Sequence, residues 1–448
     1  MSADQPPEAA QPPPTRRLRH LFDGDETNVY NSEFCNLCAG TPGPDLLRRC
    51  VDIFEEATAH RMAHERKDAF LFQYGATDGP WDFREELSRF LSKRYDDQVN
   101  EDDLVLTCGA SHGLQLILNS FIEPDGVIFV EEVTYMIAIA VFREFSGMKI
   151  VSVPFSDTGV VASELERLAR EEKAKRGDRS TGKPFWAVFY SIPVYHNPTG
   201  VCTSQEVGAE VVRVAQSLGF LVACDDVYNL LHYGAGAAPR RLHSLERSLA
   251  PPAGAAGPRR RHVVSNGSFS KILAPGVRVG WLEAPADLVQ QLRTSGILRS
   301  GGGVNSYTAG VICSALQLGL LDKHLDHLVA TFRGRMRALC DALEAALPAG
   351  CSLHPARPAG GYFVWLRLPP GLDAEAVQRH ARDTRRVSAF PGALFSPASA
   401  SSAHGPAAGS SHLRLAIAFH DEQRLAAAAR DLCSAIAELI QQRGDVLV

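Results

Sequence analysis

From about residue 100, the apolar positions of the chain form short runs that alternate with stretches of helical periodicity. Short continuous apolar runs are typical of strands that are buried on both faces of a sheet. We expect buried strands at Leu104–Leu106, Val127–Val130, Lys149–Val153, Phe185–Tyr190, Phe220–Ala223 and His262–Val264.

Helical periods separate these strands. One apolar stripe consists of Leu114, Ile117, Leu118 and Phe121, and another consists of Val207, Val211, Val214 and Leu218. The second helix is preceded by Thr203-Ser204-Gln205-Glu206, a capping box in which hydroxyl and carboxylate groups satisfy free amides. Strand–helix alternation over roughly 180 residues predicts an α/β fold whose mainly parallel sheet is covered by helices on both faces.

The C-terminal third has a different order of elements. A long helix is expected near Leu321–Leu347, because its apolar residues recur every three or four positions. The strands expected after it are Gly361–Leu368, Val387–Phe390 and Leu413–Phe419, followed by a helix from Asp421 onward. This order predicts a separate, smaller α+β domain.

Three stretches lack such periodicity. The N-terminus is rich in Pro, Ala and Gln, residues 234–261 are rich in Ala, Pro, Gly and Arg, and residues 396–411 are rich in Ser, Ala and Gly. We interpret them as a disordered tail, a solvated surface loop, and a loop or lid. The predicted domains are a tail at 1–30, an N-terminal segment of the small domain at 31–65, a large domain at 66–315 and a small domain at 316–448.

Charge and composition narrow the class of protein. The 448 residues include 46 Lys and Arg against 51 Asp and Glu, a net charge of −5. This balance argues against nucleic acid or an anionic membrane as a partner, since either would favour a basic face. The chain also lacks an apolar run near the roughly 18 residues of a transmembrane helix. The charge balance and the lack of a long apolar run favour an enzyme or a relative of an enzyme.

The ten cysteines are scattered, and only Cys35 and Cys38 form a C-x-x-C pair. Core thiols are the simpler interpretation, with a metal or redox role for this pair as the alternative. Scattered cysteines and the lack of a signal sequence predict a cytoplasmic protein. Arg16, Arg17 and Arg19 hint at a mitochondrial transit peptide, but acidic residues nearby oppose that alternative.

Residues 268–281, SFSKILAPGVRVGW, carry the most informative chemistry. Lys271 has apolar neighbours on both sides, and an apolar pocket lowers the pKa of an amine and makes it nucleophilic toward a carbonyl. The Pro-Gly turn that follows lets Arg278 return toward the hydroxyls of Ser268 and Ser270, a set of groups that suits a phosphate dianion. A nucleophilic lysine beside a phosphate site is what pyridoxal 5′-phosphate (PLP) requires.

With this motif, the chain resembles the class I and II aminotransferases, the fold-type I family of PLP enzymes, over roughly residues 36–440. Within that family it is most similar to the 2-aminoadipate, kynurenine and aromatic aminotransferases. The resemblance implies that Lys271 forms the Schiff base. It also implies that Ser268, Ser270 and Arg278 contact the cofactor phosphate.

Other motifs occur in the order found in the family. In CDDVY, Asp225 ends a predicted strand, where a carboxylate points into the ligand crevice of an α/β sheet. The resemblance implies that Asp225 keeps the cofactor's ring nitrogen protonated and that Tyr228 bonds its phenolic oxygen. Asn197, in NPTG, inherits a bond to the same oxygen, and a cis peptide bond to Pro198 is plausible there.

TCGASHGL joins a strand to a helix, and the free amides of such a helix N-terminus attract phosphate. The resemblance assigns the cofactor phosphate to the amides of Ala110 and Ser111 and to the Ser111 hydroxyl. His112 could be a catalytic base, but a polar residue of the first helical turn is the simpler interpretation.

Four further residues complete the predicted site. Tyr135 matches the aromatic residue that stacks on the cofactor ring. Tyr74 matches a tyrosine that reaches the phosphate of a neighbouring subunit, which implies an obligate homodimer with shared active sites. Arg414 alternates with apolar residues on a predicted strand and matches the arginine that grips the substrate α-carboxylate. Gly40 matches a glycine that lies against the substrate.

The predicted function is transfer of an amino group from an L-amino acid to a 2-oxo acid by ping-pong kinetics, with Lys271 as general base and acid. Aromatic amino acids, kynurenine or 2-aminoadipate are the expected donors, and 2-oxoglutarate is the expected acceptor. Two alternatives remain: a PLP-dependent β-eliminating C–S lyase, and a non-catalytic regulatory protein with the same fold. The sequence predicts no metal as a cofactor.

Overall fold

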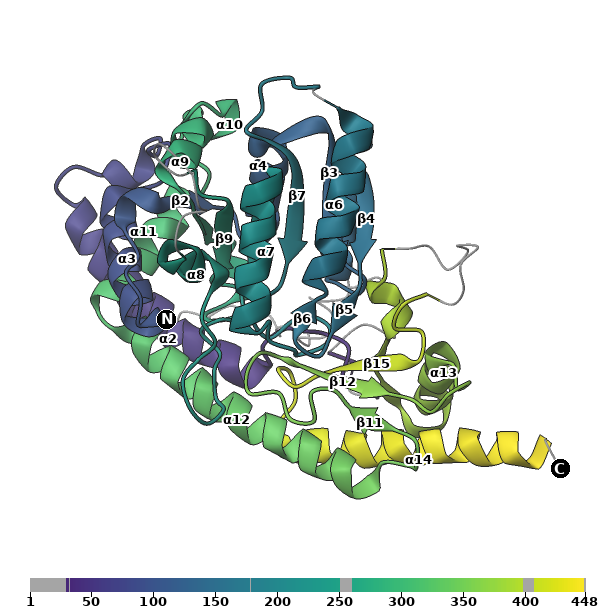
Figure 1. Ribbon diagram of the computed structural model, residues 1–448. Coiled ribbons are helices and arrows are strands. Elements are labelled where there is room, and N and C mark those ends of the chain that lie inside the picture. Colours follow the sequence, from purple (N-terminus) through teal and green to yellow (C-terminus); the bar gives the residue numbers. More distant parts are fainter. Residues whose placement is uncertain (1–29, 32, 178, 250–259, 398–406, 447–448) are drawn as a thin grey trace, which may run out of the picture.

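A computed structural model describes residues 30–31, 33–177, 179–249, 260–397 and 407–446. Its centre is a seven-stranded sheet, the large sheet, with the strand order β2-β10-β9-β8-β7-β3-β4 (Figure 1). The strands are β2 (Leu104–Thr107), β3 (Ile122–Glu131), β4 (Lys149–Val153), β7 (Phe185–Ser191), β8 (Leu221–Asp225), β9 (Val263–Ser268) and β10 (Gly280–Glu283).

The large sheet is mainly parallel. Strands β4, β3, β7, β8 and β9 run parallel to one another, whereas β10 runs antiparallel to both of its neighbours, β2 and β9. This arrangement confirms the predicted α/β class. The sequence analysis did not predict β10, because a four-residue strand after a Pro-Gly turn has too short a pattern to stand out.

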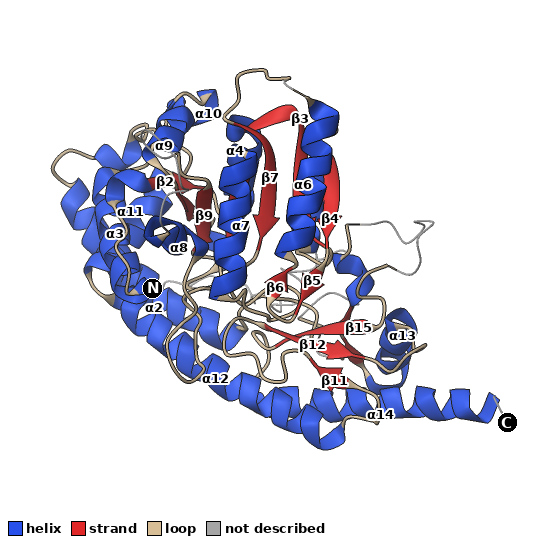
Figure 2. Ribbon diagram, in the orientation of Figure 1, coloured by secondary structure: helices blue, strands red, loops and turns tan. Residues whose placement is uncertain are grey.

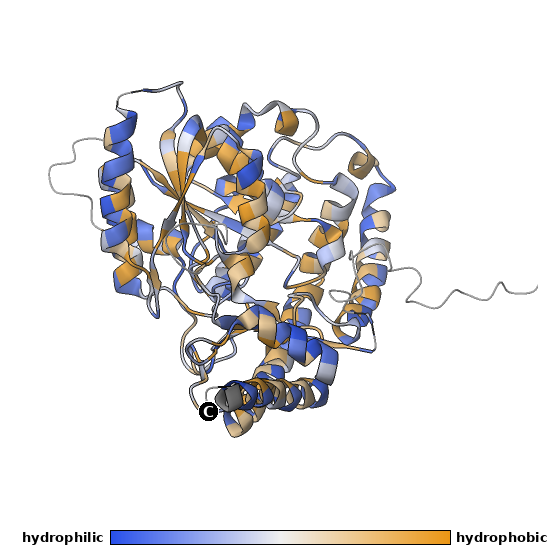
Figure 3. Ribbon diagram, turned by 90° about the vertical axis from the view of Figure 1, so that its right-hand side faces the viewer, coloured by the Kyte–Doolittle hydropathy of each residue, from blue (hydrophilic) through white to orange (hydrophobic). Residues whose placement is uncertain are grey.

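Successive side chains of a strand point to opposite faces of the large sheet and so contribute to two apolar cores, one on each face. Ile128, Val188 and Ala223 face a core that also contains the apolar stripes of α4 (Ala110–Phe121) and α5 (Met136–Glu144). Their direct neighbours, Phe129, Phe189 and Val222 among them, face the other core. The strands are accordingly orange in Figure 3, and the covering helices turn blue residues outward.

Helices cover both faces of the large sheet (Figure 2). The second core is closed by α6 (Ala162–Arg176), α7 (Gln205–Leu218) and α8 (Leu242–Ser248). The other helices of this part of the chain are α2 (Pro44–Glu65), α3 (Trp81–Tyr95), α9 (Ala286–Arg293), α10 (Gly296–Arg299) and α11 (Ser306–Gln317). A two-stranded hairpin consists of β5 (Phe155–Ser156) and β6 (Gly159–Val160).

A second, four-stranded sheet, the small sheet, is antiparallel and has the order β11-β12-β15-β14. Its strands are β11 (Ser352–Leu353), β12 (Phe363–Arg367), β14 (Phe390–Pro391) and β15 (His412–Ala416). The helices beside it are α12 (Leu320–Ala346), α13 (Ala374–Arg385) and α14 (Glu422–Val446), and α12 and α14 lie side by side in Figure 1. β1 (Cys35–Asn36), near the N-terminus, pairs with β13 (Val387–Ser388).

Several sequence expectations need correction. Lys149–Val153 forms a strand, but it is the edge strand β4 and only Val153 is buried, because nothing pairs with its outer side within the described residues. The single strand expected at Val387–Phe390 is divided into β13 and β14, which pair with different partners. Helix α7 is capped by Ser204, whose hydroxyl accepts a hydrogen bond from the Val207 amide, so the cap lies one residue later than the expected box.

The interpretation of residues 234–261 as a surface loop is wrong over residues 242–248, which form the buried helix α8. Leu242 and Leu245 contact the core under α7, and burial of each leucine contributes about 2 kcal/mol. Arg241 is also buried, and its guanidinium forms an ion pair with Glu283. Residues 250–259 lie outside the described residues, as do 398–406 of the expected loop or lid and residues 1–29 of the expected tail.

Within the described ranges, no group of three or more His, Cys, Asp or Glu side chains could hold a metal ion. The helices formed by the described residues are all too short or too polar to span a bilayer.

Candidate active site

A cavity of about 160 Å³ lies at the carboxyl ends of the parallel strands of the large sheet. This is the edge at which an α/β sheet binds its ligands. Except for Tyr74, every predicted cofactor contact lines the cavity: Ala110, Ser111, Tyr135, Asn197, Asp225, Tyr228, Ser268, Ser270, Lys271 and Arg278. Segments more than 160 residues apart therefore meet at one place.

Lys271 follows β9, and its Nζ atom donates a hydrogen bond of 2.7 Å to the Gly40 carbonyl. Lys271 is partly exposed, and the desolvation of its amine lowers its pKa to about 8, with further contributions from the positive charges of Arg414 and Arg278. Gly40 allows this approach, since a Cβ atom there would come within 2.7 Å of the Phe363 ring. The amine is therefore a nucleophile near neutral pH.

Asp225 is the last residue of β8, and it is buried. Its Oδ2 atom accepts a hydrogen bond of 2.6 Å from the Tyr190 hydroxyl, while Oδ1 is buried with no partner among the described residues. Burial raises the pKa of Asp225 to about 6, although the Tyr190 hydrogen bond acts in the opposite direction. The sequence analysis missed Tyr190, because only the pairing of β7 with β8 brings the two residues together.

The opposite end of the cavity is lined by hydroxyl groups and a guanidinium. The Ser268 hydroxyl donates to the Ser270 hydroxyl at 3.0 Å, and Arg278 Nη1 donates to the same Ser270 oxygen at 3.4 Å. Gly109 has a φ of +87° just before α4, and a Cβ atom there would come within 2.7 Å of the Arg278 guanidinium. The free amides of the helix N-terminus and the guanidinium are groups that suit an anion.

His112, on the first turn of α4, holds this turn together. Its Nδ1 atom accepts a hydrogen bond of 3.0 Å from the Cys108 amide. Burial lowers the pKa of His112, which keeps the imidazole neutral. This geometry favours the simpler interpretation of His112 as a polar residue of the first helical turn.

Arg414 lies on β15 and is buried. Its Nη1 atom donates a hydrogen bond of 2.9 Å to Asn197 Oδ1, its Nη2 atom donates to the Cys38 carbonyl, and its Nε atom has no partner in the described part of the chain. The Phe363 ring lies 4.2 Å from the guanidinium, and burial lowers the pKa of Arg414 to about 10. A buried cation without a nearby carboxylate suits an anionic ligand. The Asn197–Pro198 bond is cis.

Tyr135 and Tyr228 face the same cavity, and burial raises the pKa of both phenols. They are therefore neutral hydroxyl donors. Tyr74 lies elsewhere: its side chain is 86% exposed, next to exposed Phe70, Phe72 and Tyr307. Within one chain, the structure does not bring Tyr74 to the cavity.

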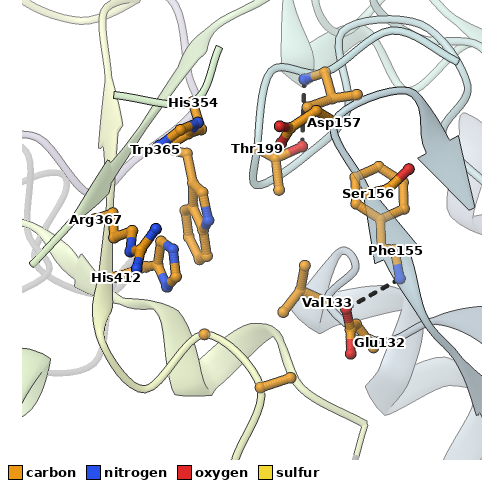
Figure 4. A pocket seen from close by; sticks show the side chains of 13 residues that line it. Glu132, Val133, Phe155, Ser156, Asp157, Thr199, His354, Trp365, Arg367 and His412 are labelled. Atoms are coloured by element: carbon orange, nitrogen blue, oxygen red, sulfur yellow. Dashed lines mark hydrogen bonds between the residues drawn. The ribbon is translucent and has the colours of Figure 1, made fainter. Parts of the chain in front are cut away.

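A second cavity, of about 370 Å³, lies between the two sheets and has no lining residue in common with the first. Figure 4 shows Trp365, Arg367 and His412 from the small sheet on one side and Glu132 and Asp157 from the other part of the chain opposite them. The Trp365 and His412 rings are stacked, with their centres 4.9 Å apart. This cavity contains no nucleophilic lysine or phosphate site among its lining residues.

The groups around the first cavity fit PLP. The unpartnered Asp225 Oδ1 suits a protonated ring nitrogen, the Lys271 amine suits an aldehyde, and the hydroxyls beside Arg278 suit a phosphate. These three groups line a single cavity.

Comparison with known proteins gives the same result. The family model for aminotransferase class I and II matches residues 33–432. The aromatic-amino-acid aminotransferase 1 of Thermococcus litoralis is 29% identical over 82% of this chain and 81% of its own length. The kynurenine aminotransferase of Pyrococcus horikoshii has a TM-score of 0.76 and 27% identity, covering 95% of this chain and 94% of that chain.

A third match is the structure of LysN, an α-aminoadipate aminotransferase from Thermus thermophilus, complexed with N-(5′-phosphopyridoxyl)-L-leucine. It has a TM-score of 0.71 and 26% identity, and covers 92% of this chain and 94% of that chain. The family model covers the strands of both sheets and all the residues that line the first cavity. The chain therefore belongs to the class I and II aminotransferases and is a PLP-dependent enzyme.

Proposed function

We propose that the protein transfers the amino group of an aromatic L-amino acid, kynurenine or 2-aminoadipate to a 2-oxo acid, with 2-oxoglutarate as the acceptor. One observation carries the proposal: the nucleophilic amine of Lys271 lines the cavity, and the buried guanidinium of Arg414 lies close enough for its charge to lower the pKa of that amine. The activities for which the relatives are named, on aromatic amino acids, kynurenine and α-aminoadipate, support this choice of donors.

Among the residues of the chain, Lys271 takes the direct part in the reaction. Bound PLP supplies an electron sink that makes the Cα proton of an amino acid acidic. The Lys271 amine holds the cofactor covalently and, once displaced by substrate, takes the Cα proton as a general base and returns it as a general acid. Its lowered pKa keeps a sizeable neutral fraction near pH 7.5, so proton uptake needs no other base.

The other residues of the cavity hold the cofactor in place. Asp225 accepts a hydrogen bond from the ring nitrogen, Asn197 and Tyr228 bind the phenolic oxygen, and Tyr135 stacks on the ring. The phosphate is bound by the amides of Ala110 and Ser111, by the hydroxyls of Ser111, Ser268 and Ser270, and by Arg278. Their positions around the cavity support these roles.

Arg414 binds the α-carboxylate of the substrate through a two-pronged contact. The Phe363 ring excludes water from one side of the guanidinium, which strengthens its attraction for an anion. Asn197 contacts the same guanidinium and so links substrate and cofactor binding. Gly40, whose carbonyl accepts the Lys271 hydrogen bond, lies beside the substrate.

The protein acts as a homodimer in this proposal. Phe70 and Phe72 are more than 60% exposed beside Tyr74, and such a cluster of exposed aromatic residues is typical of an interface. In the dimer, Tyr74 reaches the cofactor phosphate of the partner subunit. A sedimentation measurement tests this, since a monomer at micromolar concentration would contradict it.

A panel of L-amino acids tests the reaction. The purified, PLP-loaded protein is incubated with each amino acid and 2-oxoglutarate, and the 2-oxo acid product, glutamate and ammonia are quantified separately. We expect the 2-oxo acid and glutamate in equal amounts from aromatic donors, kynurenine or 2-aminoadipate. Ammonia and pyruvate from β-substituted donors, without glutamate, would instead identify a β-eliminating lyase.

A further inference from the structure

Tyr190 and Asp225 are neighbours on one face of the large sheet. Tyr190 on β7 pairs with Ala223 on β8, and Asp225 lies two residues beyond Ala223. Because side chains alternate along a strand, all three project toward the same face. The Tyr190 hydroxyl reaches Asp225 Oδ2 at 2.6 Å, whereas Oδ1 remains without a partner in the described residues.

We propose that Tyr190 is a positioning residue of the transamination site: its hydrogen bond keeps Asp225 ionised and turns Oδ1 toward the cofactor's ring nitrogen. This inference rests on the proposed function, in which Asp225 binds that nitrogen. Asp225 lines the cavity and Tyr190 does not, so Tyr190 acts through the carboxylate and not by touching the cofactor.

Asp225 needs such a donor because its surroundings favour the neutral acid. Burial is the main cause of its raised pKa, and the negative charges of Asp226 and Glu131 act in the same direction. The Tyr190 hydrogen bond and the positive charge of Lys271 act in the opposite direction, and the hydrogen bond has the larger effect of the two. A neutral Asp225 could not hold a proton on the ring nitrogen.

The other groups near Asp225 do not replace this hydrogen bond. Tyr135 and Tyr228 are close enough to feel its charge, but neither hydroxyl forms a hydrogen bond to Asp225 in the described residues. Asp226 is directed elsewhere, since its Oδ2 atom accepts from the Ser265 hydroxyl at 2.5 Å. Removal of the Tyr190 hydroxyl would therefore leave the Asp225 carboxylate without a hydrogen-bond donor from the described part of the chain when PLP is absent.

Tyr190 is well suited to this role because it is rigid and remains protonated. Its side chain is 1% exposed, and its ring contacts Phe142 edge to face with centres 5.2 Å apart. Burial and the nearby carboxylate raise the pKa of Tyr190 well above its ordinary value, so the phenol stays a donor at every working pH. A donor of fixed direction selects one carboxylate oxygen and leaves the other for the ligand.

The test is the binding of PLP to the apoprotein as a function of pH, in wild type and in Tyr190→Phe. Loss of a hydrogen bond to a charged group raises the pKa of Asp225 by about one to two units. We therefore expect the midpoint of the acidic limb of PLP binding to rise by about one unit, from near pH 6. PLP affinity should fall about tenfold at pH 5, the pH of the double-mutant cycle, and about twofold at pH 7. The matched control is Tyr195→Phe, which removes a buried hydroxyl bound to His232, and we expect its midpoint to equal that of wild type.

A double-mutant cycle separates positioning from packing. If Tyr190 acts through the carboxylate, Tyr190→Phe changes PLP affinity less than twofold in an Asp225→Asn background. An equal loss in both backgrounds would overturn the inference. Replacement of Tyr190 by 3-fluorotyrosine covers the case of a misfolded Phe variant: its more acidic phenol keeps the shape and should lower the midpoint.

An unchanged midpoint in both Tyr190→Phe and the fluorotyrosine protein would also refute the inference while leaving the proposed function intact. Failure of the wild-type protein to transaminate any donor would instead refute the proposed function. The PLP-binding midpoints would still report on Tyr190.

Discussion

The two ends of the cofactor cavity are built differently. At the ring end, Asp225 and Tyr190 are buried, and the pKa of each is raised by that burial. At the phosphate end, Ser270 is partly exposed and Arg278 is exposed. The ring end therefore depends on a few desolvated groups, whereas the phosphate end combines hydroxyls, a guanidinium and helix amides that water can reach.

This difference predicts how each end responds to substitution. Removal of one member of a buried charged pair leaves the other without compensation, which is costly. Removal of one partner of a hydrated anion leaves its other donors in place, and water takes the vacant position. Effects should consequently decrease from the ring end to the phosphate end.

The largest effect is expected for Lys271→Ala, which removes both the covalent link and the general base. We expect the rate of transamination to fall by at least about 10³-fold, since general acid–base catalysis alone contributes 10²–10⁴-fold. Borohydride reduction followed by mass spectrometry should find no adduct on the peptide that contains residue 271. Lys183→Ala, at a partly exposed lysine that does not line the cavity, is the control. An adduct retained in Lys271→Ala would contradict the assignment.

Asp225→Asn should lower kcat by about 10²–10³-fold, because it removes a preorganised charge at the site where charge develops. The variant keeps the shape of the side chain, so its melting temperature as apoprotein should stay the same or rise. Asp157→Asn, at an exposed carboxylate, serves as the control. A kcat within threefold of wild type would show that the ring end is not the more sensitive one.

Arg414→Met should reduce kcat/KM by about 10²-fold while leaving PLP affinity within a few fold, because the lost hydrogen bonds go to the substrate carboxylate. Arg367→Met is a matched control, since Arg367 lies on the paired strand β12 but faces the second cavity. Steady-state kinetics measure the loss of kcat/KM, and a PLP titration measures the cofactor affinity. Equal losses in both arginine variants would contradict a specific role for Arg414.

The rate at which the apoprotein binds PLP covalently should depend on pH through Lys271. The neutral amine is the nucleophile, and its pKa is lowered to about 8. Below pH 8 the rate should therefore fall tenfold per unit, and above pH 9 it should level off. The positive charge of Arg414 contributes to this lowered pKa, so Arg414→Met should move the midpoint upward. Stopped-flow absorbance measures both, and a midpoint near pH 10 would contradict the burial of the amine.

The smallest effect is expected for Ser268→Ala at the phosphate end. One neutral hydroxyl contributes about 1 kcal/mol, so PLP affinity should weaken about fivefold. Arg278→Met should weaken it about tenfold, because the guanidinium is exposed and other donors remain. Equilibrium dialysis measures both affinities. A larger loss of PLP affinity in Ser268→Ala than in Asp225→Asn would show that the phosphate end is the more sensitive end of the cavity.

Local sequence was sufficient where one short segment contains both the geometry and the chemistry. The segment from Ser268 to Arg278 combines a strand end, a turn and the groups it brings together, so their proximity follows from a few backbone angles. The same holds for Asp225 at the end of β8 and for the helix N-terminus at Ala110. The order of short apolar runs and helical periods likewise predicted the α/β class, because strands buried on both faces have a continuous apolar pattern.

Pairing between distant segments was decided by the tertiary structure. Tyr190 meets Asp225 only because β7 and β8 are in one particular register, and a shift of one residue would turn the tyrosine to the other face. The contact of Arg414 with Asn197 and the Cys38 carbonyl joins three segments that have no local relation. Such contacts depend on register and packing over the whole chain, which short-range periodicity does not encode.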